Sequence, residues 1–260
     1  MSQIQIATFN INSLRVRLQD LCNWLLKENI DIIGLQETKV QDPDFPWEPL
    51  QQIGYHATFR GEKGKNGVAI LSKEKPISVT FGLDEWGADG EARLIAAKFS
   101  AFTIVNTYVP QGREVGTDYF NYKLEWLRHM GDYFRRHHEP NEPLLWLGDF
   151  NVAPDPLDVY DPKRLAGRVG FHPAEQEALA SVREWGFTDI FRKHCPTGGL
   201  YTFWDYRIKD ALPRGLGWRI DHIYATAPLA AASQKAFVAT ELRQTERPSD
   251  HAPLVATFHL

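Results

Sequence analysis

The residues with the clearest capacity for chemistry stand at the ends of short apolar runs. The run Leu144 to Leu147 leads into Asp149 and Asn151, and the run that ends at Leu35 is followed closely by Glu37. Eight residues share this kind of position: Asn10, Glu37, Tyr108, Asp149, Asn151, Asp221, Asp250 and His251. If these strand ends meet at one edge of a sandwich, four carboxylates, two amides, a tyrosine and a histidine gather there.

Each of these residues also has an ordinary structural explanation. Asn, Asp and Ser after a strand commonly form turns or cap helices. Asn10, Asn12 and Ser13 directly precede a helical pattern, so one of them could simply cap that helix. Glu37 alone would be a solvated charge, and His251 alone would be a hydrogen-bonded structural histidine.

The combination indicates more specific chemistry. Neighbouring carboxylates repel one another, and a divalent cation removes that cost. Mg²⁺ takes one or two carboxylates together with amide oxygens, water and substrate phosphate. Asp221 and His251 have the residue types needed to orient and charge an imidazole. A metal-assisted hydrolase therefore stands beside the structural explanation, and spacing alone leaves both open.

Short apolar runs bounded by Gly, Asn, Asp or Pro predict the strands that would position these residues. The predicted strands cover residues 4–9, 30–35, 55–59, 68–71, 94–99, 102–108, 144–147, 201–204, 218–225, 237–240 and 253–258. Asn66-Gly67 before Val68 is a hairpin turn signal.

Apolar residues at the 3.6-residue period predict three helices, within 14–26, 120–134 and 178–185. Pro173 suits the first turn of the third helix. Both halves of the chain read as mixed α/β units with more strands than helices. The economical packing puts sheets in the middle and helices outside, because each must bury an apolar face.

Composition excludes several classes of protein. The 260 residues are 43% hydrophobic and carry a net charge of −4, so a nucleic-acid site would have to be a local patch. The two cysteines, Cys22 and Cys195, make no disulfide framework. The sequence has neither a secretory signal pattern nor an apolar run of ~18 residues. We expect one domain over residues 1–260, in a reduced, cytoplasmic, soluble protein without membrane contact.

Six motifs in order resemble exodeoxyribonuclease III, the abasic-site endonuclease branch of the endonuclease/exonuclease/phosphatase superfamily. The motifs are FNINSLR at 9–15, LQETK at 35–39, YVPQG at 108–112, GDFNVAP at 148–154, GWRID at 217–221 and PSDHAP at 248–253. The resemblance runs from Ile6 to Phe258. Any one motif alone would be weak, and six in the right order are specific.

The resemblance implies a four-layered αββα sandwich of two packed mixed β-sheets flanked by helices. It implies hydrolysis of phosphodiester bonds in double-stranded DNA during base excision repair, dependent on one or two Mg²⁺ ions or on Mn²⁺ in their place. The family cuts on the 5′ side of abasic sites, cleans blocked 3′ ends and trims duplexes from 3′ to 5′. We also expect a monomer.

The resemblance also assigns roles to individual residues. Glu37, with Asn10 nearby, resembles the principal metal site, and Asp250 is similar to a second carboxylate ligand. Asp149 resembles the acid/base group that activates water or protonates the leaving oxygen. Asn151 and Tyr108 would hydrogen-bond the phosphate, and His251, oriented by Asp221, would stabilise the transition state. Asp149, Asn151 and His251 are further candidate metal ligands.

Candidate DNA contacts are of two kinds. Phe203, Trp218 and Ile220 match an apolar pocket for a flipped-out abasic sugar, whereas Trp204 reads as core. The remaining candidates are the polar residues Asn12, Lys65, Gln111 and Arg113. Among relatives, a bulky residue in the loop that contains Gly170 is associated with loss of internal cutting, so Gly170 favours internal abasic cleavage.

Two alternatives remain beside this function. An enzyme of the same superfamily that acts on a lipid or inositol phosphate would share the core residues, although LQETK and WRID favour the DNA branch. A non-catalytic nucleic-acid-binding regulator would keep the fold and lose catalytic carboxylates and amides, which this sequence retains.

Overall fold

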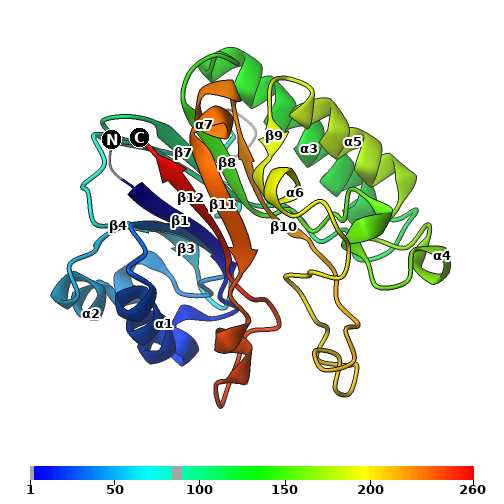
Figure 1. Ribbon diagram of the computed structural model, residues 1–260, viewed down its shortest axis with the longest axis horizontal. Coiled ribbons are helices and arrows are strands. Elements are labelled where there is room, and N and C mark those ends of the chain that lie inside the picture. Colours follow the sequence, from blue (N-terminus) through cyan, green and yellow to red (C-terminus); the bar gives the residue numbers. More distant parts are fainter. Residues whose placement is uncertain (1–2, 84–89) are drawn as a thin grey trace.

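The chain folds into two mixed β-sheets in a computed structural model that describes residues 3–83 and 90–260 (Figure 1). The first sheet has six strands in the order β11-β12-β1-β2-β4-β3, and the second has six in the order β5-β6-β7-β8-β10-β9. In the first sheet the strands are β1 (Gln3–Asn10), β2 (Ile32–Gln36), β3 (His56–Glu62), β4 (Lys65–Ser72), β11 (Ser233–Val238) and β12 (Leu254–His259). In the second they are β5 (Ser78–Phe81), β6 (Leu94–Lys98), β7 (Thr103–Tyr108), β8 (Leu144–Asp149), β9 (Thr188–Asp189) and β10 (Asp221–Ala225).

Four helices cover the outer faces of the sheets. In Figure 1, α1 and α2 lie on the side of the first sheet, and α3 and α5 lie on the opposite side, against the second. Their bounds are α1 (Leu14–Glu28), α2 (Trp47–Gln52), α3 (Asp118–His137) and α5 (Pro173–Arg183). The other helices are α4 (Pro162–Leu165), α6 (Ile190–His194) and α7 (Ala227–Ala232), with 3₁₀ turns η1 (Asp42–Asp44), η3 (Pro156–Asp158) and η4 (Thr240–Gln244). No helix in the described ranges is long and apolar enough to cross a membrane.

Three apolar clusters correspond to this layering. One lies between the sheets and joins residues of both, such as Ile6 and Leu147. A second packs α1 onto the first sheet, and a third packs α3 and α5 onto the second. Strand β8 is buried along its whole length because both of its faces are covered. The four-layered sandwich predicted from the sequence is confirmed.

The helices follow the predicted pattern closely. Leu14, Leu21, Cys22 and Leu25 form the buried face of α1, while Leu26 at its edge is exposed. Helix α5 begins at Pro173, as predicted, and ends at Arg183, two residues before the predicted end. The sequence patterns do not predict the short helices or the strands β5 and β9. Strand β5 lies at a sheet edge with mostly exposed residues, so it carries no continuous apolar run.

The hairpin turn predicted at Asn66-Gly67 is wrong. The turn between β3 and β4 lies three residues earlier, at Lys63-Gly64, and Asn66 and Gly67 form an irregularity inside β4 with φ angles of 45° and 93°. A Cβ on Gly67 would lie 2.1 Å from the Thr38 hydroxyl oxygen. Asn and Gly adopt positive φ angles readily, and here those angles let β4 pass close to the segment after β2. The Gly67 and Asn66 carbonyls accept hydrogen bonds from the backbone N–H groups of Thr38 and Lys39.

Three other strand predictions need correction. Residues 201–204 and 218–220 form isolated bridges and no continuous strand, so β10 begins only at Asp221. Their aromatic side chains pack into two small clusters beside the cleft, and this packing accounts for their apolar character without a ladder. Strand β11 ends at Val238, and Thr240 begins a 3₁₀ turn.

A buried ion cluster fixes the segment that enters β10. The guanidinium of Arg219 is fully buried and donates to Asp158 at 2.6 and 3.0 Å, and its Nη2 lies 2.8 Å from a carboxylate oxygen of Asp189. It also donates to Nδ1 of His222 at 2.9 Å, while His222 Nε2 donates to the Val152 carbonyl at 2.9 Å. Burial and the adjacent guanidinium lower the pKa of His222 to about 4. The imidazole is therefore neutral in the folded protein.

Substitution His222→Gln tests this arrangement, because glutamine offers one acceptor and one donor without a titratable group. The unfolded chain takes up a proton on His222 below an ordinary pKa of about 6.5, whereas the folded chain does so only near 4. His222 therefore costs stability as pH falls through that window. From pH 7 to pH 5 the parent should lose about 2 kcal/mol of unfolding free energy relative to the variant, measured by urea titration. An identical pH dependence in the two proteins would contradict the neutral imidazole.

Candidate active site

Strand ends from both sheets meet at one place in the sandwich. In the first sheet, β1 ends at Asn10 and its parallel partner β2 ends just before Glu37. In the second sheet, Tyr108 at the end of β7 pairs with Asp149 at the end of β8. Asp149 also pairs with Asp221 at the start of antiparallel β10. The strand order thus brings together residues that lie far apart in the sequence, from Asn10 to Asp221. The sequence patterns predict that these strand ends share one edge of the sandwich.

The amide of Asn10 joins the two sheets. Asn10 is fully buried, and its Nδ2 donates to Glu37 at 2.9 Å and to Asp149 at 2.8 Å. Its Oδ1 accepts from the backbone N–H of Asn12 at 3.0 Å. Ser249 donates to the Asn10 carbonyl at 2.7 Å, which ties the segment before β12 to the end of β1. A carboxylate from each sheet is therefore held by one amide nitrogen.

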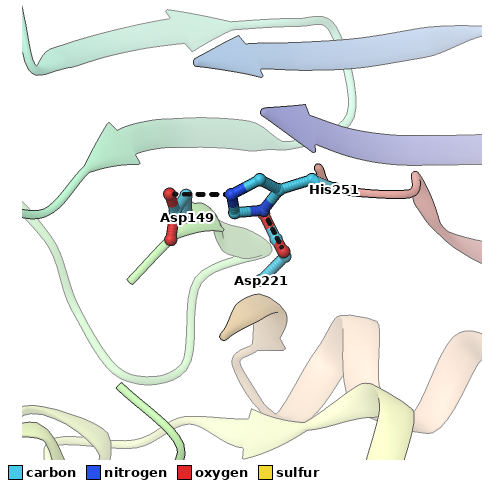
Figure 2. A group of neighbouring side chains, drawn as sticks. All are labelled: Asp149, Asp221 and His251. Atoms are coloured by element: carbon cyan, nitrogen blue, oxygen red, sulfur yellow. Dashed lines mark hydrogen bonds and ion pairs between the residues drawn. The ribbon is translucent and has the colours of Figure 1, made fainter. Parts of the chain in front are cut away.

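A histidine–aspartate pair lies on the other side of Asp149 (Figure 2). Nδ1 of His251 lies 2.8 Å from Oδ2 of Asp221, and Nε2 lies 3.9 Å from Oδ2 of Asp149. All three side chains are almost completely buried. The imidazole is thus oriented by Asp221 with its other nitrogen turned toward Asp149.

The charges of these groups depend on one another. Burial alone disfavours the imidazolium, but Asp221 and Asp149 outweigh it and raise the pKa of His251 to about 10. Burial and the nearby carboxylates raise the pKa of Asp149 to about 7, although His251 and Asn10 favour its charged form. Glu37 is different, because hydrogen bonds from Asn10 and Lys39 overcome burial and lower its pKa. The site therefore holds one carboxyl poised near neutrality beside one that stays ionised.

Two more sequence-predicted residues join the cluster through side-chain contacts. Nδ2 of Asn12 donates to Asp250 at 3.0 Å. Asn151 donates its backbone N–H to Asp149 at 2.9 Å, and its Nδ2 donates to the Val109 carbonyl at 3.0 Å. Because that nitrogen is committed, the amide oxygen is the atom of Asn151 left to face a ligand.

Tyr108 is held between a cation and the carboxylates. Arg93 lies over its ring at 4.7 Å and donates to its carbonyl at 3.3 Å. Burial, together with Glu37 and Asp149, holds the pKa of the Tyr108 hydroxyl well above its usual value, so it remains a hydrogen-bond donor.

A cleft of about 1190 Å³ opens over these groups. Its floor includes Glu37, Tyr108, Asp149 and His251. Phe203, Trp218 and Ile220 line one side of it, and the Phe203 ring lies 4.9 Å from that of His251. Trp204 is buried in a separate cluster, as expected for a core residue.

The polar DNA-contact candidates are spread over different places. Gln111 and Arg113 line the cleft, together with Gly170. Lys65 lies away from the cleft wall, is mostly exposed and pairs with Glu62 at 3.0 Å. Asn12 lies beneath Asp250 and contacts the ammonium of Lys39 at 2.5 Å.

Sequence reasoning assigned no role to Lys39, Arg93 or Lys123, which support the site. Lys39 pairs with Glu37 at 2.8 Å. It lies two residues after Glu37 in the LQETK motif, and this position was the only sequence signal for its role. Lys123 is fully buried beneath the cleft. A lysine on the apolar face of a predicted helix, three residues after Phe120, was the signal for it.

The donor set fits a hard divalent cation. Asp149, Asp221 and His251 offer ligand atoms that lie within 4.8 Å of one another. His251 is a poor ligand in this state, because Nδ1 is hydrogen-bonded to Asp221 and the ring is charged. Oδ1 of Asp221 is buried and has no hydrogen-bond partner among the described residues, so the cluster has unused acceptor capacity. Carboxylate and amide oxygens are the ligands that Mg²⁺ and similar ions prefer.

Comparisons with known proteins place the chain in a family. The pattern of the endonuclease/exonuclease/phosphatase family matches residues 7–251. Exodeoxyribonuclease III of Haemophilus influenzae is 35% identical, with 98% of this chain and 100% of that protein covered. The DNA repair nuclease APEX1 of Danio rerio is 32% identical, with 97% of this chain and 81% of that protein covered.

Solved structures agree with the sequence relatives. An AP endonuclease from Archaeoglobus fulgidus superposes with a TM-score of 0.96 at 45% identity, covering 99% of this chain and 100% of that one. The 3′ phosphatase NExo from Neisseria, bound to a product DNA hairpin, gives a TM-score of 0.94 at 38% identity over 99% of this chain and 100% of that one. The chain therefore belongs to the endonuclease/exonuclease/phosphatase family. Within that family it is similar along its whole length to exodeoxyribonuclease III and to AP endonucleases.

The charge state of His251 is directly measurable. In the parent protein with chelator present, the His251 ring should still be doubly protonated at pH 8, because Asp221 and Asp149 raise its pKa. Asp221→Asn should lower that pKa by about 1–3 units, the usual effect of removing one adjacent opposite charge. Nitrogen chemical shifts of the histidine rings in an NMR titration measure both.

Asp205→Asn is the matched control, because Asp205 lines the same cleft and pairs with Arg207. It should leave the His251 titration unchanged. A His251 ring that titrates identically in the parent and in Asp221→Asn would show that this carboxylate does not hold the charge.

Proposed function

We propose that this chain is a Mg²⁺-dependent DNA repair nuclease that hydrolyses phosphodiester bonds in duplex DNA. It cleaves on the 5′ side of abasic sites, cleans blocked 3′ ends and degrades duplexes from 3′ to 5′. The observation that carries the proposal is that one cleft is lined both by acidic, hydrogen-bonded residues and by aromatic ones. The similarity to exodeoxyribonuclease III and to a 3′ phosphatase bound to DNA supports this substrate class.

One or two Mg²⁺ ions, replaceable by Mn²⁺, supply Lewis acidity at the scissile phosphate when bound. Glu37 is the main proposed ligand, because its low pKa keeps it ionised, and Asn10 holds it in place while offering an amide oxygen of its own. Asp250 is the proposed second carboxylate. Asp149, Asn151 and His251 remain candidate ligands for a further position.

Asp149 is the proposed acid/base group. Its pKa of about 7 suits a group that must take a proton from water and return it to the leaving oxygen at neutral pH. His251 presents its charged Nε2 to the phosphate side of the cleft, and Asp221 fixes that orientation through Nδ1. Tyr108 is a proposed hydrogen-bond donor to the phosphate oxygens where charge builds. Asn151 is proposed as a second donor, through the Nδ2 proton that lies 3.3 Å from Asp149 in the free protein.

The aromatic wall is the proposed receptor for a sugar that has lost its base. Phe203 lies 4.9 Å from the His251 ring, and Trp218 and Ile220 line the same cleft, so one flipped-out nucleotide could reach the aromatic wall and the acidic floor together. Extrusion costs least where base pairing is already absent, so an abasic nucleotide is favoured over an intact one. Asn12, Gln111, Arg113 and, further from the cleft, Lys65 are the proposed contacts to the DNA backbone, and the monomer is the proposed active form.

Removal of the catalytic carboxylates tests the proposed chemistry. Asp149→Asn and Glu37→Gln should each lower the rate of Mg²⁺-dependent cleavage of an abasic duplex by at least about 10²–10⁴-fold, the usual contribution of a general acid/base or a preorganised charge. Thermal unfolding should stay close to that of the parent, because both replacements keep size and one acceptor. Asp155→Asn is a control, since Asp155 caps the turn η3 and lies outside the cleft floor. A purified Asp149→Asn protein that cuts at the parental rate would remove Asp149 from the mechanism.

The aromatic wall makes a separate prediction about selectivity. Trp218→Ala and Phe203→Ala should reduce internal abasic cleavage about tenfold more than 3′-end trimming, because an aromatic stacking contact is worth about 1–3 kcal/mol. Single-turnover rates on the two end-labelled substrates give the ratio. Trp204→Phe, at a neighbouring buried position, should leave the ratio unchanged. Equal loss of both activities in Trp218→Ala would argue against the pocket.

A further inference from the structure

A single buried ammonium lies beneath the cleft, at the point where three of its loops converge. Lys123 on α3 has no exposed side-chain surface. Its Nζ donates to the carbonyls of Asn151 at 2.7 Å and of Gln111 at 3.4 Å, and its third contact is the carboxylate of Glu175. A Cβ on Gly112 would lie 3.0 Å from the Lys123 stem, so the Gln111 loop packs closely on it. The three protons of the ammonium are therefore directed to two cleft loops and to one partner carboxylate.

The partner carboxylate extends the connection to a third loop. Glu175 is in the first turn of α5 and is fully buried. Its Oε2 accepts from the backbone N–H of Gly170 at 2.8 Å and of His172 at 3.2 Å. Gly170 in turn offers its carbonyl to the N–H of Ala153 at 2.7 Å, next to the Asn151 segment. One ion pair thus links the loops that carry Gln111, Asn151 and Gly170.

The loop that carries Asn151 needs such support. Asn151 has φ of 52°, in the left-handed region that residues with a Cβ adopt at a cost. Its side chain and N–H are bound to Val109 and Asp149, and Lys123 holds its carbonyl. The N–H, the carbonyl and the side-chain nitrogen of Asn151 are therefore all held before any substrate arrives, which leaves its amide oxygen to face a ligand.

The loop that carries Gly170 lies against the aromatic wall. Gly170 has φ of 85°, and a Cβ there would lie 3.4 Å from the Asn151 carbonyl oxygen and 3.4 Å from the Trp218 ring. The distance between Asn151 and the Trp218 face is therefore set by where the Gly170 backbone lies. That position is held by Glu175.

We propose that the Lys123–Glu175 ion pair is a positioning device that fixes Asn151 and the Gly170–Trp218 wall relative to one another, and so sets turnover and the preference for internal abasic sites. This inference rests on the proposed function. Both residues are positioning residues, since neither lines the cleft. Stability alone is a poor reason for the pair, because a buried ion pair often gains nothing over apolar residues of similar size. The neighbouring α3–α5 contact is already apolar through Leu127, Leu179 and Val182.

The test uses Lys123→Met and the double variant Lys123→Met/Glu175→Gln. The single variant leaves the Glu175 carboxylate buried without its partner, so the double variant, which leaves no unpaired buried charge, serves if the single variant folds poorly. In both, kcat on an internal abasic duplex should fall about 10–100-fold with KM changed less than about threefold, since a displacement of about 1 Å is enough to cost ~10²-fold. The ratio of internal cutting to 3′-end trimming should fall as well. In an Asn151→Ala background, Lys123→Met should cost less than in the parent, because the side chain that Lys123 positions through the backbone is already absent.

Leu179→Ala is the matched control, because it weakens the same helix contact without touching the loops. It should lower the melting temperature yet keep the parental kcat and activity ratio. Hydrogen exchange gives a readout that needs no substrate: the Gly170 and Ala153 amides should lose protection in the two Lys123 variants, while that of Ile223 in β10 is unchanged. The proposal is overturned if those two amides keep their protection in the Lys123 variants. It is also overturned if Leu179→Ala, at the same melting temperature as a Lys123 variant, loses as much activity as that variant. A parent chain that cuts no DNA would instead refute the proposed function, and hydrogen exchange would still decide the positioning claim.

Discussion

The concentration of negative charge where the two sheets meet is the constraint on which the rest of the structure depends. Asp149 and Asp221 face one another across a strand pair and are buried, and Glu37 approaches from the other sheet. Such a cluster repels itself unless each carboxylate has a partner. The Asn10 amide donates to Glu37 and Asp149, and the His251 imidazolium lies between Asp221 and the same Asp149. The contacts that let the cluster fold thus also hold together the groups that could bind a cation.

Holding this cluster requires unusual backbone in the loops around it. Glu37, Lys39 and Asn151 all have positive φ, at 49°, 52° and 52°. Left-handed conformations at such residues persist only where the surroundings over-determine them. Here the restraints come from elsewhere in the fold: the β4 irregularity accepts from the segment after Glu37, and a buried lysine holds the Asn151 carbonyl. Hydrogen bonds from β4 and α3 thus restrain loops that have no regular secondary structure.

Much of this arrangement could be predicted from the sequence, because apolar runs and the polar residues after them are local signals. Asn10, Asp149 and Asp221 are end residues of strands, and Glu37 directly follows one; the structure brings all four together. Signals that depend on tertiary contact were misleading or silent. Asn66-Gly67 has turn chemistry but serves a close approach between strands, and Lys123 gains its meaning only once α3 lies beneath three loops. The aromatic segments near Phe203 and Trp218 resembled strands because they are apolar, although their rings face a cleft.

The account's central claim is that the acidic floor and the aromatic wall act on one substrate. The most direct test is cleavage of an end-labelled duplex that contains a single internal abasic analogue, with Mg²⁺ and with chelator. We predict a Mg²⁺-dependent nick immediately 5′ of the analogue, and none with chelator. Shortening only from the 3′ end would contradict the role of the aromatic wall. An intact duplex under both conditions, from a folded protein, would contradict the proposed nuclease itself.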